Sequence, residues 1–460
     1  MIKYISVKIC VICGKYKHYS FSIMIKTSLK QAWAMMKQNR LFTSIYVAGT
    51  ALSVAFTMIL FIIYYVKFAP IYPEYNRNRT LVINNLRTET NGGNNWSCNA
   101  GVSSKMIGLL KDLKHLDKMG AASQMGGFLG LSLTLPESNE TYTPIIQLVD
   151  HGFWEVFTFN FISGKPFTEV DVESNLPKAV ISESMANRYF ATSDATGKYL
   201  DFDGNKIQVC GVVKDGSTAS MTTMGEIYLP LYYGGLLKQY QDDVSLTGSI
   251  ALYLTASSSD DIEMLRMEVQ EVVKQYDLQY EDMVNNLIGQ PDVWWKNYFR
   301  ESCGLEPDIS ASVRGILYMV LALLFIPSMN LCGMISSRMD ERLSELGVRK
   351  AYGATNRSLI GQVLTENLLL TVVGALIGLA LAYFIVLTGR EWVMKIMDAG
   401  NALSGMKVTY PMTFHLEMLI NLPLFLTVLG LCLILNLVSA LVPTVLALRH
   451  PIIYSIHSKR

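Results

Sequence analysis

Charged residues are scarce in this sequence of 460 residues. They make up 17% of the chain, whereas an average soluble protein contains about 25%. Hydrophobic residues make up 50%, and the mean hydropathy is +0.27. The apolar residues gather in runs longer than a globular core requires, on both sides of a middle region of ordinary soluble composition. The composition therefore excludes a wholly soluble enzyme and indicates a protein that lies partly in lipid.

Motifs of catalysis and metal binding are also missing. The six histidines are scattered, and the sequence contains no HExxH, GxSxG or GxxxxGK(S/T) motif. Cys10 and Cys13 form a lone CxxC without a second pair or a histidine at zinc spacing, so we expect no metal site. Cys98, Cys210 and Cys303 allow one disulfide, and their spacing leaves its pairing open. We therefore expect no enzyme activity from this chain by itself, no bound cofactor and no nucleic-acid partner.

Four apolar segments reach the length of about 20 residues that is needed to cross a bilayer. Apart from Arg314 at the start of the second segment, none of them has a lysine, arginine or aspartate. A buried core helix is the alternative for any single segment, but the length of all four favours membrane spans. We predict transmembrane helices at residues 41–66, 313–337, 359–387 and 416–448.

The charge distribution predicts the orientation of these spans. Short basic stretches precede the first span and connect the second span to the third, at 338–358, and such stretches stay in the cytoplasm. The insert at 67–312 contains 19 basic and 31 acidic residues, a net charge of −12, so the rest of the chain carries +13 for a total of +1. We expect this insert and a short loop at 388–415 to lie outside. Both termini, including a tail at 449–460, should be cytoplasmic.

The residues before the first span divide into two parts. Residues 1–23 form neither a span nor a signal peptide, because basic residues and a glycine interrupt their apolar run, and Met24 is an alternative start. Residues 24–40 place apolar and basic side chains on different sides of a helix, which indicates an interfacial amphipathic helix on the inner membrane surface. The alternative is that they are the frayed start of the first span.

The insert at 67–312 alternates short strand-like runs with amphipathic helices and turns, which predicts an α+β domain. The fold class is therefore an α-helical membrane protein with four transmembrane helices and an α+β extracytoplasmic domain between the first two. We predict helices at 105–116 and 260–275, the second capped by Ser258 or Ser259, and a turn at 202–205. The predicted strands are 80–85, 145–149, 178–181, 206–213, 227–230 and 249–254.

The connection at 338–358 is the most informative part of the sequence. Its first residues are compatible with a helix, which Gly353 can end in the left-handed conformation. Thr355 or Asn356 can cap the helix that follows. This pattern predicts two helices joined by a tight turn that protrudes into the cytoplasm, although an ordinary solvated loop would have a similar composition.

The same connection contains the run Glu345-Leu-Gly-Val-Arg-Lys-Ala-Tyr-Gly-Ala354. With this run the connection resembles a known family, the FtsX-like, MacB-type ABC transporter permeases. It is similar to their signature E-(I/L)-G-(I/V)-R-(K/R)-A-x-G-A, and the resemblance extends over nearly everything after Met24, including the external stretch at 149–171. Gln362 and Glu366 follow the signature at the spacing typical of the family. The signature residues here are Glu345, Leu346, Gly347, Val348, Arg349, Lys350, Ala351, Tyr352, Gly353 and Ala354.

The resemblance implies a function and a set of partners in the bacterial inner membrane. In this family four-span subunits pair as homodimers or heterodimers, and a separate ABC ATPase that uses ATP and Mg drives them through the connection between spans two and three. Membrane lipid surrounds the complex, and a periplasmic adaptor and an outer-membrane channel are further expected partners. By mechanotransmission, ATP hydrolysis would move the extracytoplasmic domain to export or extract a hydrophobic or peptide-like substrate.

The resemblance also implies roles for individual residues. Leu346 and Val348 would be apolar contacts in a groove of the ATPase, while Arg349 and Lys350 would pair with its acidic residues or with anionic lipid. The alternative for the two basic residues is that they only mark the inner interface of the membrane. A small-residue face suits close helix packing, against the fourth span of the same chain or another helix. It consists of Gly374, Gly378 and Ala382.

Two other functions compete with transport. An FtsX-like regulator would not transport anything, and its external domain would activate an extracytoplasmic cell-wall hydrolase. A membrane-anchored enzyme is the third class, which the missing catalytic motifs disfavour.

Overall fold

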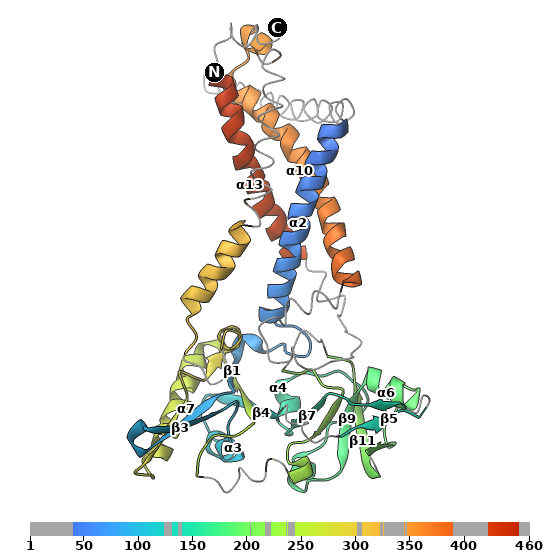
Figure 1. Cartoon of the computed structure of the whole chain (residues 1–460), viewed down its shortest axis with the longest axis vertical. Coiled ribbons are helices and arrows are strands. Elements are labelled where there is room, and N and C mark those ends of the chain that lie inside the picture. The colour runs from blue at the N-terminus through green and yellow to red at the C-terminus, as the bar shows by residue number, and fades with distance from the viewer. Residues whose placement is uncertain are drawn as a thin grey trace, which may run out of the picture. The chain divides into compact units, whose positions relative to one another are not determined.

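The first apolar run forms a single helix, α2 (Arg40–Phe68), in the computed structural model of the chain (Figure 1). Two more helices, α10 (Asn356–Thr388) and α13 (Leu422–Arg449), are also long and apolar enough to cross a membrane. A shorter apolar helix covers Ile309–Ala322. The structure describes residues 40–123, 131–136, 140–202, 204–216, 222–235, 237, 244–300, 306–322, 325, 345, 347–389 and 422–449.

Several predicted segments lie outside the described residues. They are the N-terminal extension at 1–23, the interfacial helix at 24–40 apart from Arg40, and the loop at 388–415 apart from its first two residues. The tail at 449–460 is described only at Arg449. Of the second predicted span, residues 313–322 and 325 are described.

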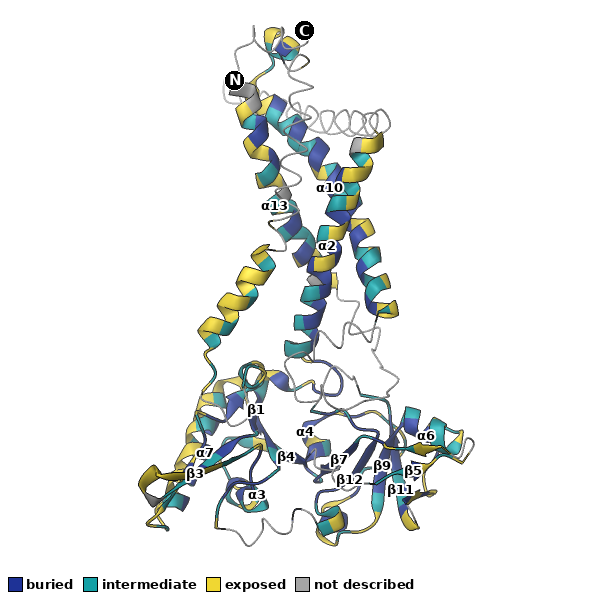
Figure 2. Cartoon of the chain, in the orientation of Figure 1, coloured by how far each residue is buried: buried dark blue, intermediate teal, exposed yellow. Residues whose placement is uncertain are grey.

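The chain folds as two units. The first, the membrane unit, comprises the described residues within 40–63, 313–389 and 422–449. The second, the external unit, comprises the described residues within 64–312. This division confirms the predicted class, in which membrane helices flank a mixed α+β domain. Within the membrane unit, most side chains of the helix Ile309–Ala322 are exposed (Figure 2), and exposed apolar surface of this extent calls for cover by lipid or protein.

One mixed sheet of ten strands forms the core of the external unit. Its order is β10-β11-β9-β12-β7-β4-β13-β1-β15, and β8 also pairs with β11. The pairs β11–β9 and β12–β7 are parallel, whereas the other pairs are antiparallel. These strands are β1 (Thr80–Ile83), β4 (Leu116–Ser123), β7 (Ile146–Val149), β8 (Phe161–Gly164), β9 (Lys178–Ser182), β10 (Tyr199–Phe202), β11 (Asn205–Val213), β12 (Ile227–Pro230), β13 (Ala251–Ala256) and β15 (Asp292–Val293).

Smaller elements complete the external unit. Strands β14 (Met283–Asn286), β2 (Leu86–Thr90) and β3 (Asn95–Asn99) form a three-stranded sheet, and β5 (Leu133–Thr134) pairs with β6 (Thr141–Tyr142). The helices are α3 (Ser104–Leu110), α4 (Phe153–Val156), α5 (Glu169–Glu173), α6 (Glu183–Phe190), α7 (Ile262–Asp277) and α8 (Trp294–Asn297).

The structure confirms the predicted strands, with shifts of up to two residues at their ends, and the turn between β10 and β11, where Gly204 has a φ of 93°. The predicted helix at 105–116 is wrong at its C-terminal end. Helix α3 ends at Leu110, two turn hydrogen bonds follow, and Leu116 already begins β4. Strand β4 was not predicted because its sequence, LDKMGAAS, is poor in the β-branched and aromatic residues typical of strands.

Small residues in β4 allow α4 to pack closely against it. A Cβ atom at Gly120 would lie 2.8 Å from the Cα of Phe153. The turn before α4 is held by Asp150, whose Oδ1 accepts hydrogen bonds from the backbone N–H groups of Ala121 and Phe153, each at 2.8 Å. Burial raises the pKa of this carboxyl group to about 6. The motif thus fixes Phe153 in an aromatic core with Phe157, at 4.8 Å between ring centroids.

Candidate functional site

The signature residues form a short helix that ends in a tight turn. Residues 347–351 are helical, and Gly353 follows with a φ of +90°. Gly353 N donates to Lys350 O at 3.1 Å and Ala354 N donates to Arg349 O at 3.0 Å, which is the hydrogen-bond pattern of a Schellman motif. The predicted left-handed end at Gly353 is therefore confirmed. We call residues 345–355 the coupling segment; within it, Leu346 lies outside the described residues.

Helix α10 begins directly after this turn. Thr355 is its N-cap, because its Oγ1 accepts a hydrogen bond from Ser358 N at 3.3 Å. Of the two caps that the sequence allows, the structure therefore uses Thr355 rather than Asn356. Only four residues, 352–355, lie between the end of one helix and the start of the next, so the direction of the coupling segment is tied to that of α10.

Among the described residues of the coupling segment, Tyr352 has the most exposed large side chain. It is 90% exposed, and Val348, one helical turn before it, is 46% exposed. Residues four apart lie on the same side of a helix, and Tyr352 N donates to Val348 O at 3.0 Å. The two side chains therefore offer an apolar and aromatic surface. Val348 was singled out from the sequence, whereas the exposure of Tyr352 was not, since tyrosine fits either a buried or an exposed position.

Arg349 links the coupling segment to α10 by hydrogen bonds within the chain. Its Nη2 donates to Glu345 Oε1 at 2.6 Å, and its Nη1 donates to Gln362 Oε1 at 2.7 Å across the turn. Gln362 Nε2 in turn donates to Glu366 Oε1 at 3.2 Å. Glu366 is only 2% exposed, and an ionisable side chain buried in a membrane helix requires such partners. Sequence reasoning assigned Arg349 to an external partner and missed these internal contacts. Lys350 is half-buried.

The small-residue face of α10 packs against α2. A Cβ atom at Gly374 would lie 2.8 Å from Thr50 Cβ, and one at Gly378 would lie 2.5 Å from Ala51 O. Ala382 is fully buried. One turn before Gly374, the hydroxyl groups of Thr371 and Tyr46 lie 3.2 Å apart at hydrogen-bond distance. The sequence does not identify the helix that packs against this face. The structure shows that at Gly374 and Gly378 it is α2, the first span.

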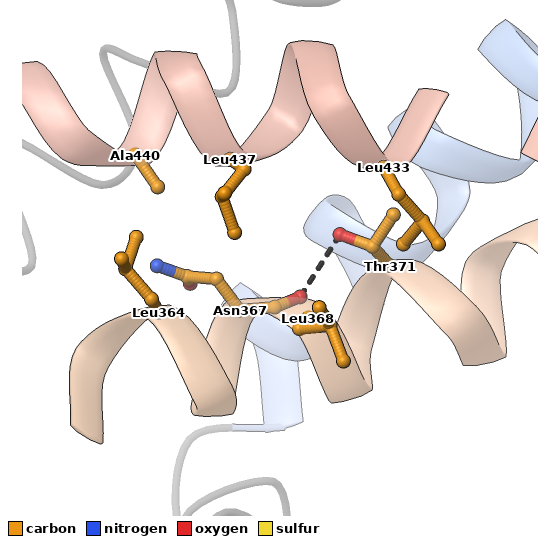
Figure 3. Close-up of a pocket in the computed structure, with 7 residues that line it drawn as sticks. All are labelled: Leu364, Asn367, Leu368, Thr371, Leu433, Leu437 and Ala440. Carbon is orange, nitrogen blue, oxygen red and sulfur yellow. Dashed lines mark hydrogen bonds between the residues drawn. The ribbon is translucent and has the colours of Figure 1, made fainter. Parts of the chain in front are cut away.

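A small cavity lies between α10 and α13 (Figure 3). Its volume of about 10 Å³ is room for about one water molecule. Inside it, Thr371 Oγ1 donates to Asn367 O at 2.9 Å, as the dashed line shows. The described helices therefore enclose no passage for a large substrate at this place. The lining residues are Leu364, Asn367, Leu368, Thr371, Leu433, Leu437 and Ala440.

The described residues also offer little for redox or metal chemistry. Cys210 Sγ donates to Ala179 O at 3.3 Å, and burial raises the pKa of this thiol to about 11, so it stays protonated and unreactive at neutral pH. Cys303 lies outside the described residues. Within the described part of the chain, no three histidine, cysteine, aspartate or glutamate side chains gather around a point where a metal ion would fit.

Comparison with known families gives two matches. Residues 43–272 match the MacB-like periplasmic core domain, and residues 317–452 match the FtsX-like permease C-terminal domain. The first match covers the first span and most of the external unit. The second covers the coupling segment and the two spans that follow it.

Curated relatives are similar at low identity. An uncharacterized ABC transporter permease of Bacillus subtilis, YknZ, is 21% identical over 59% of this chain and 64% of its own length. A pyoverdine export ATP-binding/permease protein of Pseudomonas putida, PvdT, is 23% identical over 80% of this chain and 53% of its own length. The chain thus spans between half and two thirds of the length of these two relatives. The crystal structure of the extracellular domain of YknZ matches 44% of this chain and all of its own chain, with 18% identity and a TM-score of 0.29.

Proposed function

Because the chain belongs to the FtsX-like, MacB-type ABC transporter permeases with a MacB-like periplasmic core domain, we propose that it is the membrane subunit of an ATP-driven mechanical export system. The protein is a multi-pass membrane protein with a periplasmic domain. In this proposal a separate ABC ATPase, which uses ATP and Mg, binds the coupling segment in the cytoplasm. The permease pairs with a second permease subunit and moves a hydrophobic or peptide-like substrate outside the membrane.

The observation that carries the proposal is the construction of the coupling segment. It exposes Val348 and Tyr352, while Arg349 holds the segment to Gln362 of α10. A contact that transmits force needs both an exposed surface for the partner and a rigid connection to the membrane helices. The exposed pair supports the first requirement, and the hydrogen bond from Arg349 to Gln362 supports the second.

The direction of transport is supported by the relatives. Proteins similar to this chain include a pyoverdine export protein and a macrolide export protein from Neisseria meningitidis, each named as an ATP-binding/permease protein. The present sequence contains no GxxxxGK(S/T) motif, and in this proposal a separate ABC ATPase binds the ATP. An outer-membrane channel and a periplasmic adaptor fit the export function, and the expected orientation keeps both termini in the cytoplasm.

The purified chain should hydrolyse no ATP above the background of the assay, because it lacks a motif that binds the phosphates. Each ABC ATPase subunit of the source organism is co-expressed with the tagged chain, and the complexes are purified and assayed in lipid nanodiscs. One of these ATPases should bind stably and hydrolyse ATP in the complex. A matched complex in which that ATPase has lost its phosphate-binding lysine controls for contamination. Substantial ATP turnover by the chain alone would contradict the proposal.

A further inference from the structure

A buried arginine holds the outer end of α2 within the external unit. Arg77 is 5% exposed, and its Nη1 donates to Val66 O at 2.7 Å and to Ala69 O at 2.6 Å. The last carbonyl groups of a helix have no partner within the helix, and a cation there also offsets the negative end of the helix dipole. Helix α2 therefore ends on a side chain that belongs to the sheet-forming part of the chain, since β1 begins three residues after Arg77.

Glu74 extends this connection to a second segment. Its Oε2 accepts a hydrogen bond from Arg77 Nε at 2.7 Å, and its Oε1 accepts one from Thr223 Oγ1 at 2.7 Å. Thr223 lies shortly before β12, near the middle of the sheet. The guanidinium of Arg77 also lies 5.2 Å from the ring centroid of Trp294, the first residue of α8. The ion pair thus joins the end of α2, the β11–β12 connection and α8.

A second buried pair occupies the corresponding place on the way to the second span. Arg300 Nε donates to Asp292 Oδ2 at 2.5 Å, and their side chains are 1% and 0% exposed. Asp292 belongs to β15, which pairs with β1. Both connections to the membrane helices therefore enter the sheet through neighbouring strands, and each is held by a buried arginine and a carboxylate. The rings of Phe68 and Tyr298 link the two connections directly, with centroids 5.6 Å apart.

A buried ion pair is a weak source of stability, because the loss of hydration offsets most of the attraction and a hydrophobic pair of similar size often performs as well. Its distinctive property is geometry, since the planar guanidinium fork fixes the directions of several hydrogen bonds at once. We propose that the cluster of Glu74, Arg77 and Thr223 is the joint that fixes the last turn of α2, residues 64–68, to the sheet of the external unit, so that movement of this turn displaces the sheet. This inference rests on the proposed function, in which movement of the first span must reach the external unit.

The joint is tested by a distance measurement that requires no ATPase. Genetically encoded spin labels are placed at Tyr65 on α2 and at Lys206 on β11 of the full chain in nanodiscs, and the distance distribution is measured by pulsed electron resonance. The unaltered chain should give one narrow distance. Glu74→Gln should broaden the distribution, because the amide cannot hold the guanidinium as the carboxylate does. Thr223→Val, which removes the hydrogen bond from Thr223 Oγ1 to Glu74 Oε1 and leaves the Glu74–Arg77 pair in place, should broaden it less.

The matched control is Glu263→Gln. Glu263 also pairs with an arginine three residues away, Arg266, but its side chain is 68% exposed, so the distribution should stay narrow. Circular dichroism identifies a variant that has not folded. If Glu74→Gln fails to fold, the distance distribution of Thr223→Val alone tests the inference. Narrow distances in every folded variant of Glu74 and Thr223 would overturn the inference.

A second readout separates this inference from the proposed function. The Glu74→Gln chain should still bind the partner ATPase, because the coupling segment is unchanged, but should lose substrate export. If the unaltered chain binds no ATPase, the proposed function fails while the distance data still decide on the joint. If Glu74→Gln broadens the distance and leaves export intact, the cluster holds the last turn of α2 on the sheet without transmitting force, and the inference fails.

Discussion

Replacing Gly353 by valine should leave the protein in the membrane but abolish its binding to the ATPase and its function in cells. Gly353 has a φ of +90°, and no atom lies within 4 Å of the position that a Cβ would take. The penalty therefore comes from the backbone alone and is about 1–3 kcal/mol. A segment that relieves this strain by changing its turn loses the bonds of Gly353 and Ala354 to the preceding helix. Val348 and Tyr352 would then face a different direction.

Two control variants isolate the backbone effect. Asparagine adopts positive φ more readily than other residues with a side chain, so Gly353→Asn should retain much of the binding. Gly361 also has open space around it, but it lies inside α10 without a positive φ, so Gly361→Ala should behave like the unaltered chain. Binding is measured by pull-down of the ATPase and function by export in cells. If Gly353→Val matches Gly361→Ala in both, the coupling segment is only a solvated connection.

Replacing Gly378 by leucine should prevent the membrane unit from assembling correctly. A Cβ atom there would lie 2.5 Å from Ala51 O and 2.9 Å from Val54 Cβ. Because one of these atoms belongs to the backbone, α2 and α10 would have to move apart along their whole contact. Overpacking usually costs about 1–3 kcal/mol, and a leucine at such a close backbone contact should exceed that range.

The matched control for this prediction is Gly430→Leu. Gly430 lies in α13, and nothing lies within 4 Å of its Cβ position, so a leucine there should be accepted. Folded yield and thermal melting of the two variants in detergent are compared with those of the unaltered chain. Equal yield and equal melting temperature for Gly378→Leu and Gly430→Leu would contradict the close packing of α10 on α2.

Local features of the fold were the ones predicted from sequence. The turn at Gly353, the cap before α10 and strands such as β12 each depend on a few neighbouring residues. The residue types at those positions are therefore enough to predict them. Strand β4 was missed because its small residues are dictated by the approach of α4, which lies some thirty residues further along the chain.

Contacts between distant residues could not be predicted. Glu74 and Arg77 lie three positions apart and resemble an exposed surface pair in sequence, yet both are buried. Their additional partners, Thr223 and Trp294, are far away in the chain. Likewise, nothing in the signature itself indicates that Arg349 bonds to Gln362 rather than to another protein. Burial and partner choice are properties of the folded chain, and a single sequence does not contain a local signal for them.

We expect the coupling segment to contact the ATPase through Val348 and Tyr352, and site-specific cross-linking tests this contact most directly. A photoreactive amino acid is placed at Tyr352, at Val348 or, as a control, at Lys274, an exposed residue of α7 in the external unit. The chain is expressed with the partner ATPase and irradiated in intact cells. The account predicts a cross-linked product with the ATPase from positions 352 and 348 and none from position 274. Absence of the product at both coupling positions, in cells where the two proteins copurify, would show that the ATPase binds elsewhere and would contradict the account.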